Sequence, residues 1–102
     1  MASAVTPIPG VNSQVSVGGT SVVAVAANPN GGYITNPVAA SDQAIVAAEV
    51  LYVNPIGAAT LAANGQTVAI QPGGTYDIIP GQTTPTYVNA ATSGHKFTVV
   101  SW

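Results

Sequence analysis

The stretch AATLAANGQTVAIQPGGTYDIIPGQTTPTYVNA, residues 58–90, decides the fold class because it alternates short apolar runs with turn signals. Asn64-Gly65 lies between two alternating runs, a pattern that favours a type I′ hairpin with Leu61 opposite Val68. Pro72-Gly73 and Pro80-Gly81 each place proline and glycine as a type II turn requires. The stretch therefore predicts consecutive short strands joined by tight turns.

The same period of two continues on both sides of this stretch. Strands are expected around residues 15–17, 20–27, 33–35, 43–53, 58–63, 66–70, 75–79, 85–90 and 95–102. Turn residues recur about every eight to twelve positions, which is typical of an all-β protein. We predict one antiparallel β-sandwich or small barrel of about seven to nine short strands over residues 15–102. Residues 1–14 are predicted to form an extended N-terminal arm, because Pro7 and Pro9 oppose helix.

Residues 38–48 are ambiguous between helix and strand. Their alanines favour helix, and Ser41 could cap a short turn. Alternation from Gln43 to Val53, with β-branched and aromatic residues continuing through Tyr52, favours a strand instead. We interpret the segment as a strand with apolar residues on both faces, one against the core and one against another subunit.

Charge is scarce in this chain. Only 4% of its residues are charged, against about 25% in an ordinary soluble domain. Nucleic-acid binding needs clustered Lys and Arg, and no apolar run approaches the ~20 residues of a membrane helix, so neither partner is expected. A surface with so little charge favours a protein that belongs to an assembly, in which neighbouring subunits cover much of that surface. The alternative is a robust secreted module rich in Ser, Thr, Asn and Gln.

The inventory of reactive side chains predicts no enzyme. Cysteine is absent, and His95 is the only histidine. A triad with Asp42 or Asp77 is conceivable, but no G-x-S-x-G elbow surrounds a serine. Too few ligands exist for a zinc site, and no calcium or phosphate loop is present. We predict no catalytic residue, metal or cofactor, and interpret His95 as a polar residue at the start of a strand.

The segments YITNP, LYVNP and ANGQT, the two Pro-Gly turns and the terminal SGHKFTVVSW carry a resemblance over residues 31–102. In style and order they resemble small virion proteins of tailed bacteriophages, of the capsid decoration or cement type. The resemblance implies a β-rich protein that binds the icosahedral shell as an oligomer. It implies the major capsid protein as partner and the capsid surface as location, and it transfers no functional residue.

The sequence also names candidates for such contacts. The terminal strand places Phe97 and Val99 on the core face and Lys96 and Trp102 on the other. We expect the arm to become ordered only in an assembly, and the protein to form a homo-oligomer, a trimer or dimer. The interface candidates are Pro7, Ile8, Pro9, Val46, Val50, Tyr52 and Trp102. For Trp102 two contacts are expected as alternatives, one with a neighbouring subunit and one over the end of its own sheet. The competing hypothesis is a head fibre or tail component whose aromatic side chains stack on a host surface glycan.

Overall fold

The computed structural model describes residues 6–102, which fold into strands joined by turns and loops, with one short helix. The elements are β1 (Gln14–Val15), β2 (Val22–Val25), β3 (Gly32–Thr35), α1 (Ala40–Gln43), β4 (Leu51–Asn54), β5 (Val68–Ile70), β6 (Thr75–Asp77), β7 (Thr86–Asn89), β8 (His95–Lys96) and β9 (Thr98–Ser101). Every pairing between these strands is antiparallel. The predicted all-β class is confirmed.

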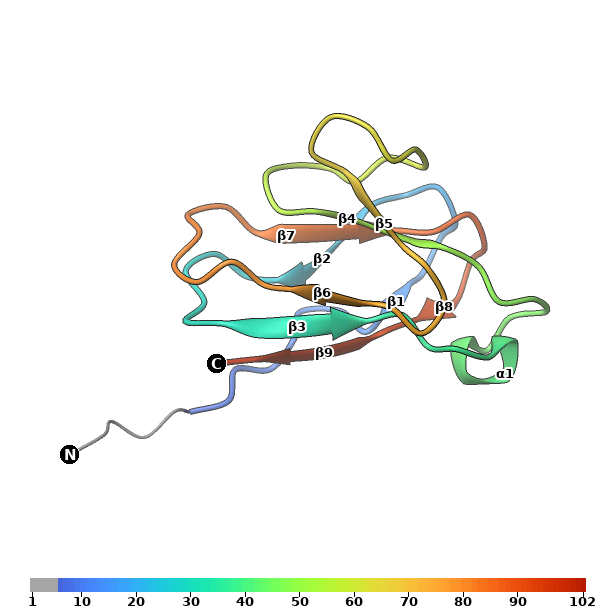
Figure 1. Cartoon of the computed structure of the whole chain (residues 1–102), viewed down its shortest axis with the longest axis horizontal. Helices are drawn as coiled ribbons and strands as arrows, with labels where there is room; N and C mark the ends of the chain where they lie inside the picture. Colours follow the sequence, from blue (N-terminus) through green and yellow to red (C-terminus); the bar gives the residue numbers. More distant parts are fainter. Residues whose placement is uncertain (1–5) are drawn as a thin grey trace.

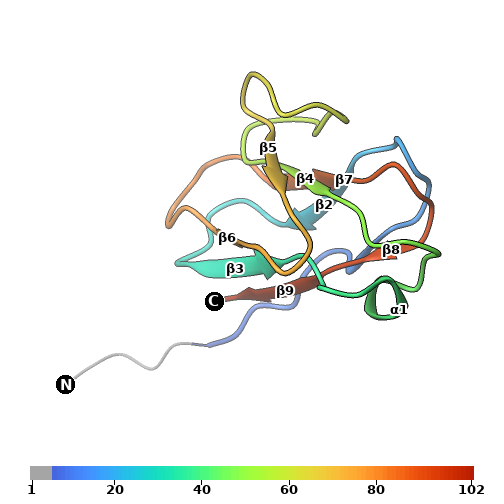
Figure 2. The same cartoon turned by 45° about the vertical axis from the view of Figure 1, so that its right-hand side comes forward.

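Two sheets lie against each other as the layers of a sandwich (Figure 1). One sheet has the strand order β2-β7-β4-β5, and the other has the order β6-β3-β9. The short ribbon β1-β8 extends the layer that contains β9, because β8 leads directly into that strand. In the turned view of Figure 2, β5 and the loop before it stand away from the body of the sandwich.

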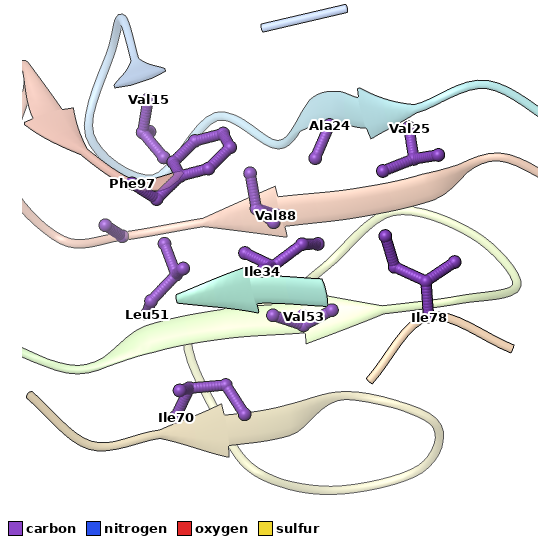
Figure 3. Close-up of a cluster of buried hydrophobic side chains, with 11 residues drawn as sticks. Val15, Ala24, Val25, Ile34, Leu51, Val53, Ile70, Ile78, Val88 and Phe97 are labelled. Atoms are coloured by element: carbon purple, nitrogen blue, oxygen red, sulfur yellow. The ribbon is translucent and has the colours of Figure 1, made fainter. Parts of the chain in front are cut away.

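The core fills the space between the sheets with small and medium apolar side chains (Figure 3). Leu51, Val53 and Val88 come from the first sheet and Ile34 from the second, and each is fully buried. Phe97 lies between β8 and β9 and is 4% exposed, so its predicted place in the core is confirmed. Alternation on each strand supplies these inward positions, as expected for a sheet with one buried face.

Both predicted Pro-Gly turns are present. The amide of Gly74 donates to the carbonyl of Gln71 at 2.8 Å around Pro72-Gly73, and Gly73 has a φ of 85°. Around Pro80-Gly81 the amide of Gln82 donates to the carbonyl of Ile79 at 3.4 Å. A left-handed glycine after proline is the requirement of a type II turn. These turns set the short connections on either side of β6.

A turn forms with Gly65 and Gln66 at its centre rather than Asn64 and Gly65, so the predicted type I′ hairpin and its register are wrong. Thr67 donates its amide to the carbonyl of Asn64 at 3.0 Å, while Val68 pairs with Val53 rather than with Leu61. Residues 55–67 form a loop instead of a strand, since the buried Asn54 side chain accepts hydrogen bonds from the amides of residues 56 and 57. These bonds turn the chain away from the sheet as soon as β4 ends.

The predicted strand from Gln43 to Val53 is wrong over its first half. Residues 40–43 form α1, and residues 44–50 are irregular until β4 begins at Leu51. Alanine favours the helical turn, and Ala44, with a φ of 60°, ends it in the left-handed conformation. The expected pair of apolar faces is therefore absent, and of its members only Leu51 and Val53 enter the core.

The described part of the arm, residues 6–14, is extended and lies on its own sandwich. Ile8 and Ser101 exchange two hydrogen bonds of 2.7 and 2.9 Å, and the amide of Val11 donates to the carbonyl of Ala24 at 3.0 Å. The expectation that the arm is ordered only in an assembly is wrong for these residues. The open edge of β9 explains this, because its backbone groups pair with a neighbouring extended chain. Residues 1–5 lie outside the described part.

Candidate functional site

His95 begins β8 opposite Val15 and is completely buried. Its predicted place at the start of a strand is confirmed, but the sequence did not indicate its burial. The amide of Gly94 donates to the carbonyl of Val15 at 2.7 Å, which fixes the chain just before the histidine. The imidazole consequently points into the molecule rather than toward solvent.

Both nitrogens of the His95 ring face oxygen atoms. Nδ1 lies 3.1 Å from Oε1 of Glu49, and Nε2 lies 2.8 Å from Oδ1 of Asn36. Glu49 lies in the irregular segment before β4, and Asn36 follows β3. The ring thus joins three segments that are far apart along the chain. We call Asn36, Gln43, Glu49, Thr92 and His95 the His95 cluster.

Asn36 is fully buried, and the orientation of its amide is determined by two backbone carbonyls. Its Nδ2 donates to the carbonyl of Glu49 at 2.9 Å and to the carbonyl of Ile70 at 2.8 Å. Only the amide nitrogen can donate to carbonyl oxygens, so Oδ1 is the atom that faces the histidine. Asn36 therefore presents an acceptor to Nε2 of His95.

Gln43 is the one buried residue of α1 and ties the helix to its surroundings. Its Nε2 donates to Oδ1 of Asn36 at 3.0 Å and to the carbonyl of Pro37 at 2.7 Å. Its Oε1 accepts from the amide of Glu49 at 3.1 Å. These bonds replace the strand ladder that the alternation from Gln43 to Val53 had predicted.

Glu49 is the charged member of the His95 cluster, and its side chain is 22% exposed. The amide of Thr92 donates to Oε1 at 2.9 Å, and the hydroxyl of Thr92 donates to Oε2 at 2.8 Å. Burial acts to raise the pKa of Glu49, but hydrogen bonds from His95 and Thr92 and the charge of His95 outweigh it. The pKa of Glu49 therefore lies below its usual value, and the carboxylate is ionised at neutral pH.

The arrangement binds segments of this chain to one another. Every polar atom of Asn36, Gln43 and His95 described above has a partner within the protein. Within residues 6–102 no pocket is detected, and no group of three or more metal-ligating side chains is found. The one helix in this range, α1, has four residues and is far too short to cross a bilayer.

The interface candidates do not form one surface. Ile8 is bonded to Ser101, next to Trp102, whereas Val46 follows α1 at the opposite end of the molecule (Figure 1). Pro7, Ile8, Pro9 and Val46 are exposed, and Val50, Tyr52 and Trp102 are half-buried. The amide of Trp102 donates to the carbonyl of Gly31 at 3.1 Å, and the indole lies against this glycine. Trp102 thus makes a contact within its own chain.

Large apolar side chains are common on the described surface. Ten of them are exposed: Ile8, Val11, Val17, Tyr33, Val38, Val46, Ile56, Leu61, Val68 and Ile79. Three of these belong to β5 or to the loop of residues 55–67 that precedes it. Few charges separate them, because the whole chain has four charged side chains. The surface can thus bury apolar area at little cost in charge desolvation.

Comparisons with protein families, with curated proteins and with solved structures find no match to this chain.

Proposed function

We propose that this protein is a non-enzymatic structural protein of a tailed-phage virion, which binds the outside of the icosahedral capsid and stabilises it. Its partner in this proposal is the major capsid protein. The resemblance of residues 31–102 to small virion proteins supports the proposal, together with the physical character of the described surface.

The observation that carries the proposal is the combination of exposed apolar side chains with very low charge. Val46 is 101% exposed and Val38 is 69% exposed, and both lie close to α1. Ordinary soluble domains use charge to keep copies of themselves apart. A protein that binds a shell once and stays there needs complementary apolar contacts more than electrostatic steering.

The outer strands of the sandwich offer a second kind of contact. β2 and β5 are the outer strands of the four-stranded sheet, and β6 is an outer strand of the three-stranded sheet. Strands at sheet edges can pair with a neighbouring chain through backbone hydrogen bonds. The arm already uses this mode within the molecule, since Ile8 pairs with Ser101 of β9.

We propose that the protein is a homo-oligomer, a trimer or dimer, on the capsid. Ten large apolar side chains are exposed on a single small domain, and a second copy of the chain would cover part of this apolar surface. Sedimentation of the purified protein at tens of micromolar checks this expectation. A monomer that stays soluble at that concentration contradicts self-association.

Copy number tests the proposed function directly. The protein is quantified against the major capsid protein on a gel of purified virions. A decoration or cement protein is expected at hundreds of copies per particle. A few copies would contradict capsid decoration and favour a head fibre or tail component that binds a host surface glycan.

A surface variant tests the apolar character of the contact. Val46→Asp should leave the fold intact, because the side chain is fully exposed. We expect lower occupancy on particles for this variant if the surface near α1 contacts the shell. Thr83→Asp, at another exposed loop position, is the matched control and should bind as the unmodified protein does.

A further inference from the structure

The His95 ring can satisfy both of its contacts only when both nitrogens carry protons. Nδ1 faces a carboxylate oxygen of Glu49, and Nε2 faces the amide oxygen of Asn36. A neutral imidazole has one donor and one acceptor nitrogen, so one of the two oxygens would then face a lone pair. Neither oxygen can become a donor while the rest of the cluster is intact.

Asn36 cannot rotate to relieve such a contact. A flip of its amide would place Oδ1 against the carbonyl oxygens of Glu49 and Ile70, which now accept from Nδ2 at 2.9 and 2.8 Å. It would also turn Nδ2 toward Nε2 of Gln43, which is itself a donor. The acceptor at Nε2 of His95 is therefore fixed by three other groups.

Glu49 cannot supply the missing proton without losing a bond. Oε1 accepts from the amide of Thr92 and Oε2 accepts from the hydroxyl of Thr92. Both oxygens thus act as acceptors of an ionised carboxylate, in agreement with the lowered pKa of Glu49. Among the described residues, Glu49 is the one charged side chain within hydrogen-bonding distance of the ring. Asp42 of α1 and Lys96 of β8 are exposed.

We propose that His95 is held as a buried imidazolium between Glu49 and Asn36, and that loss of its second proton loosens residues 37–49 from β8. The cluster is then a pH-sensitive latch at the end of the molecule that carries α1 and β8 (Figure 1). Removal of the Nδ1 proton leaves a lone pair against the Glu49 carboxylate, and removal of the Nε2 proton leaves one against Asn36. Either loss weakens the attachment of the segment that carries α1.

The direction of the pH effect follows from which protonation state of His95 the folded protein stabilises. The geometry favours the charged ring, so the latch is closed while the ring carries both protons and Glu49 is ionised. It opens as pH rises and the ring loses its second proton. The segment that is released carries the exposed Val38 and Val46, so its position on the surface becomes dependent on pH.

The protonation state of the ring is directly measurable, because His95 is the only histidine in the chain. Long-range proton–nitrogen correlation spectra of the nitrogen-15-labelled protein report both ring nitrogens without any assignment problem. We expect both nitrogens to give the shift of a protonated nitrogen at pH 6, with a single transition at higher pH. A ring nitrogen that is unprotonated at pH 6 in the folded protein would overturn the proposal.

Hydrogen exchange tests the release of the segment. The amide of Thr92 donates to Oε1 of Glu49 across the attachment, and the amide of Glu49 donates to Oε1 of Gln43, which is itself bonded to Asn36. We expect the protection factors of these two amides, corrected for intrinsic exchange, to fall at least tenfold across the ring transition. Amides between β4 and β7 serve as the internal control and should keep their protection. Unchanged protection of Thr92 and Glu49 across the transition contradicts the latch.

A pair of variants tests whether the Glu49 carboxylate, rather than the overall charge of the protein, stabilises the charged ring of His95. In Glu49→Gln the ring should lose its second proton at a lower pH than in the unmodified protein, because the carboxylate charge is absent. Asp77→Asn makes the same chemical change at an exposed carboxylate on β6 and should leave the transition in place. Equal midpoints for Glu49→Gln and the unmodified protein would refute the role of Glu49. If Glu49→Gln does not fold, the spectra of the unmodified protein decide the question.

Discussion

Removal of the Asn36 side chain should destabilise the protein more than any change at the surface. Asn36→Ala deletes two donated and two accepted hydrogen bonds at a fully buried position. Gln43 keeps its bond to the carbonyl of Pro37, so three groups lose their partner there: the carbonyls of Glu49 and Ile70, and Nε2 of His95.

The expected loss can be worked from these three groups. A buried polar group left without a partner costs ~1–3 kcal/mol. Three such groups give about 3–9 kcal/mol, and water that enters the space lowers the upper end of this range. Domains of this kind have a free energy of unfolding of about 5–15 kcal/mol, so the variant should lie near the limit of folding. Each kcal/mol corresponds to about 4–8 °C in the melting temperature of a small domain.

Urea unfolding, followed by tryptophan fluorescence, measures this loss as a shift of the midpoint. The denaturant slope should stay unchanged, because the same surface is exposed on unfolding. Asn30→Ala is the matched control, since Asn30 is exposed, and it should change the stability by less than about 0.5 kcal/mol. A loss below about 1 kcal/mol for Asn36→Ala would refute the reasoning that the cluster holds the loops to the sheets.

Three further changes have defined expectations. Gly65→Val should lower the free energy of unfolding by about 1–2 kcal/mol, because Gly65 has a φ of 57°, while Gly57→Val, in open space, serves as the control for melting. Glu49 has a lowered pKa in the fold, so its stabilisation is present above its ordinary value of ~4.3 and is lost as pH falls through the folded value. Acid titration of Glu49→Gln by circular dichroism should therefore show a shallower loss than the unmodified protein. Trp102→Ala should lower stability by roughly 1–2 kcal/mol while the protein stays folded, because the half-buried indole packs on Gly31; an unchanged melting temperature would contradict that contact.

The parts of the fold that were predicted correctly depend on local chemistry. The Pro-Gly turns around β6 form because proline and glycine impose backbone angles wherever they occur. The terminal strand alternates as expected, with Phe97 and Ser101 inside and Lys96 and Thr98 outside. Alternation of side chains is a property of the strand itself, so it is visible in the sequence.

The parts that were predicted wrongly depend on competition from polar side chains. Residues 43–50 alternate like a strand, but Gln43 bonds to Pro37 and to the amide of Glu49 and holds the chain in a loop. Asn54 likewise ends β4 by binding the amides of the next turn, and this moves the partner of Val68 to Val53. These contacts join residues through space, so periodicity in the sequence does not reveal them.

The His95 cluster was missed for a related reason. A lone histidine after a glycine is typical of an exposed strand start, and nothing near it in sequence indicates a partner. One signal was available in Glu49, a carboxylate inside the apolar run AIVAAEVLYV. A charge in such a run needs a buried partner if the run enters the fold, and His95 is the only cationic side chain besides Lys96.

Buried amide side chains at the ends of strands explain how a core of mostly small aliphatic side chains specifies one structure. Asn36 follows β3, Asn54 ends β4 and Asn89 ends β7, and each binds backbone groups of a loop on its sheet. A core of valines, isoleucines and alanines fixes volume but permits many loop arrangements. Amide side chains with satisfied donors and acceptors favour one of them, because an arrangement that breaks these bonds leaves buried polar groups unpaired. Because the buried amides hold the loops in place, the fold does not depend on ion pairs at the surface. The surface can therefore carry many apolar side chains. This division agrees with both proposals: an exterior with few charges suits lasting contact, and the single histidine of a buried cluster controls how firmly one surface segment is held.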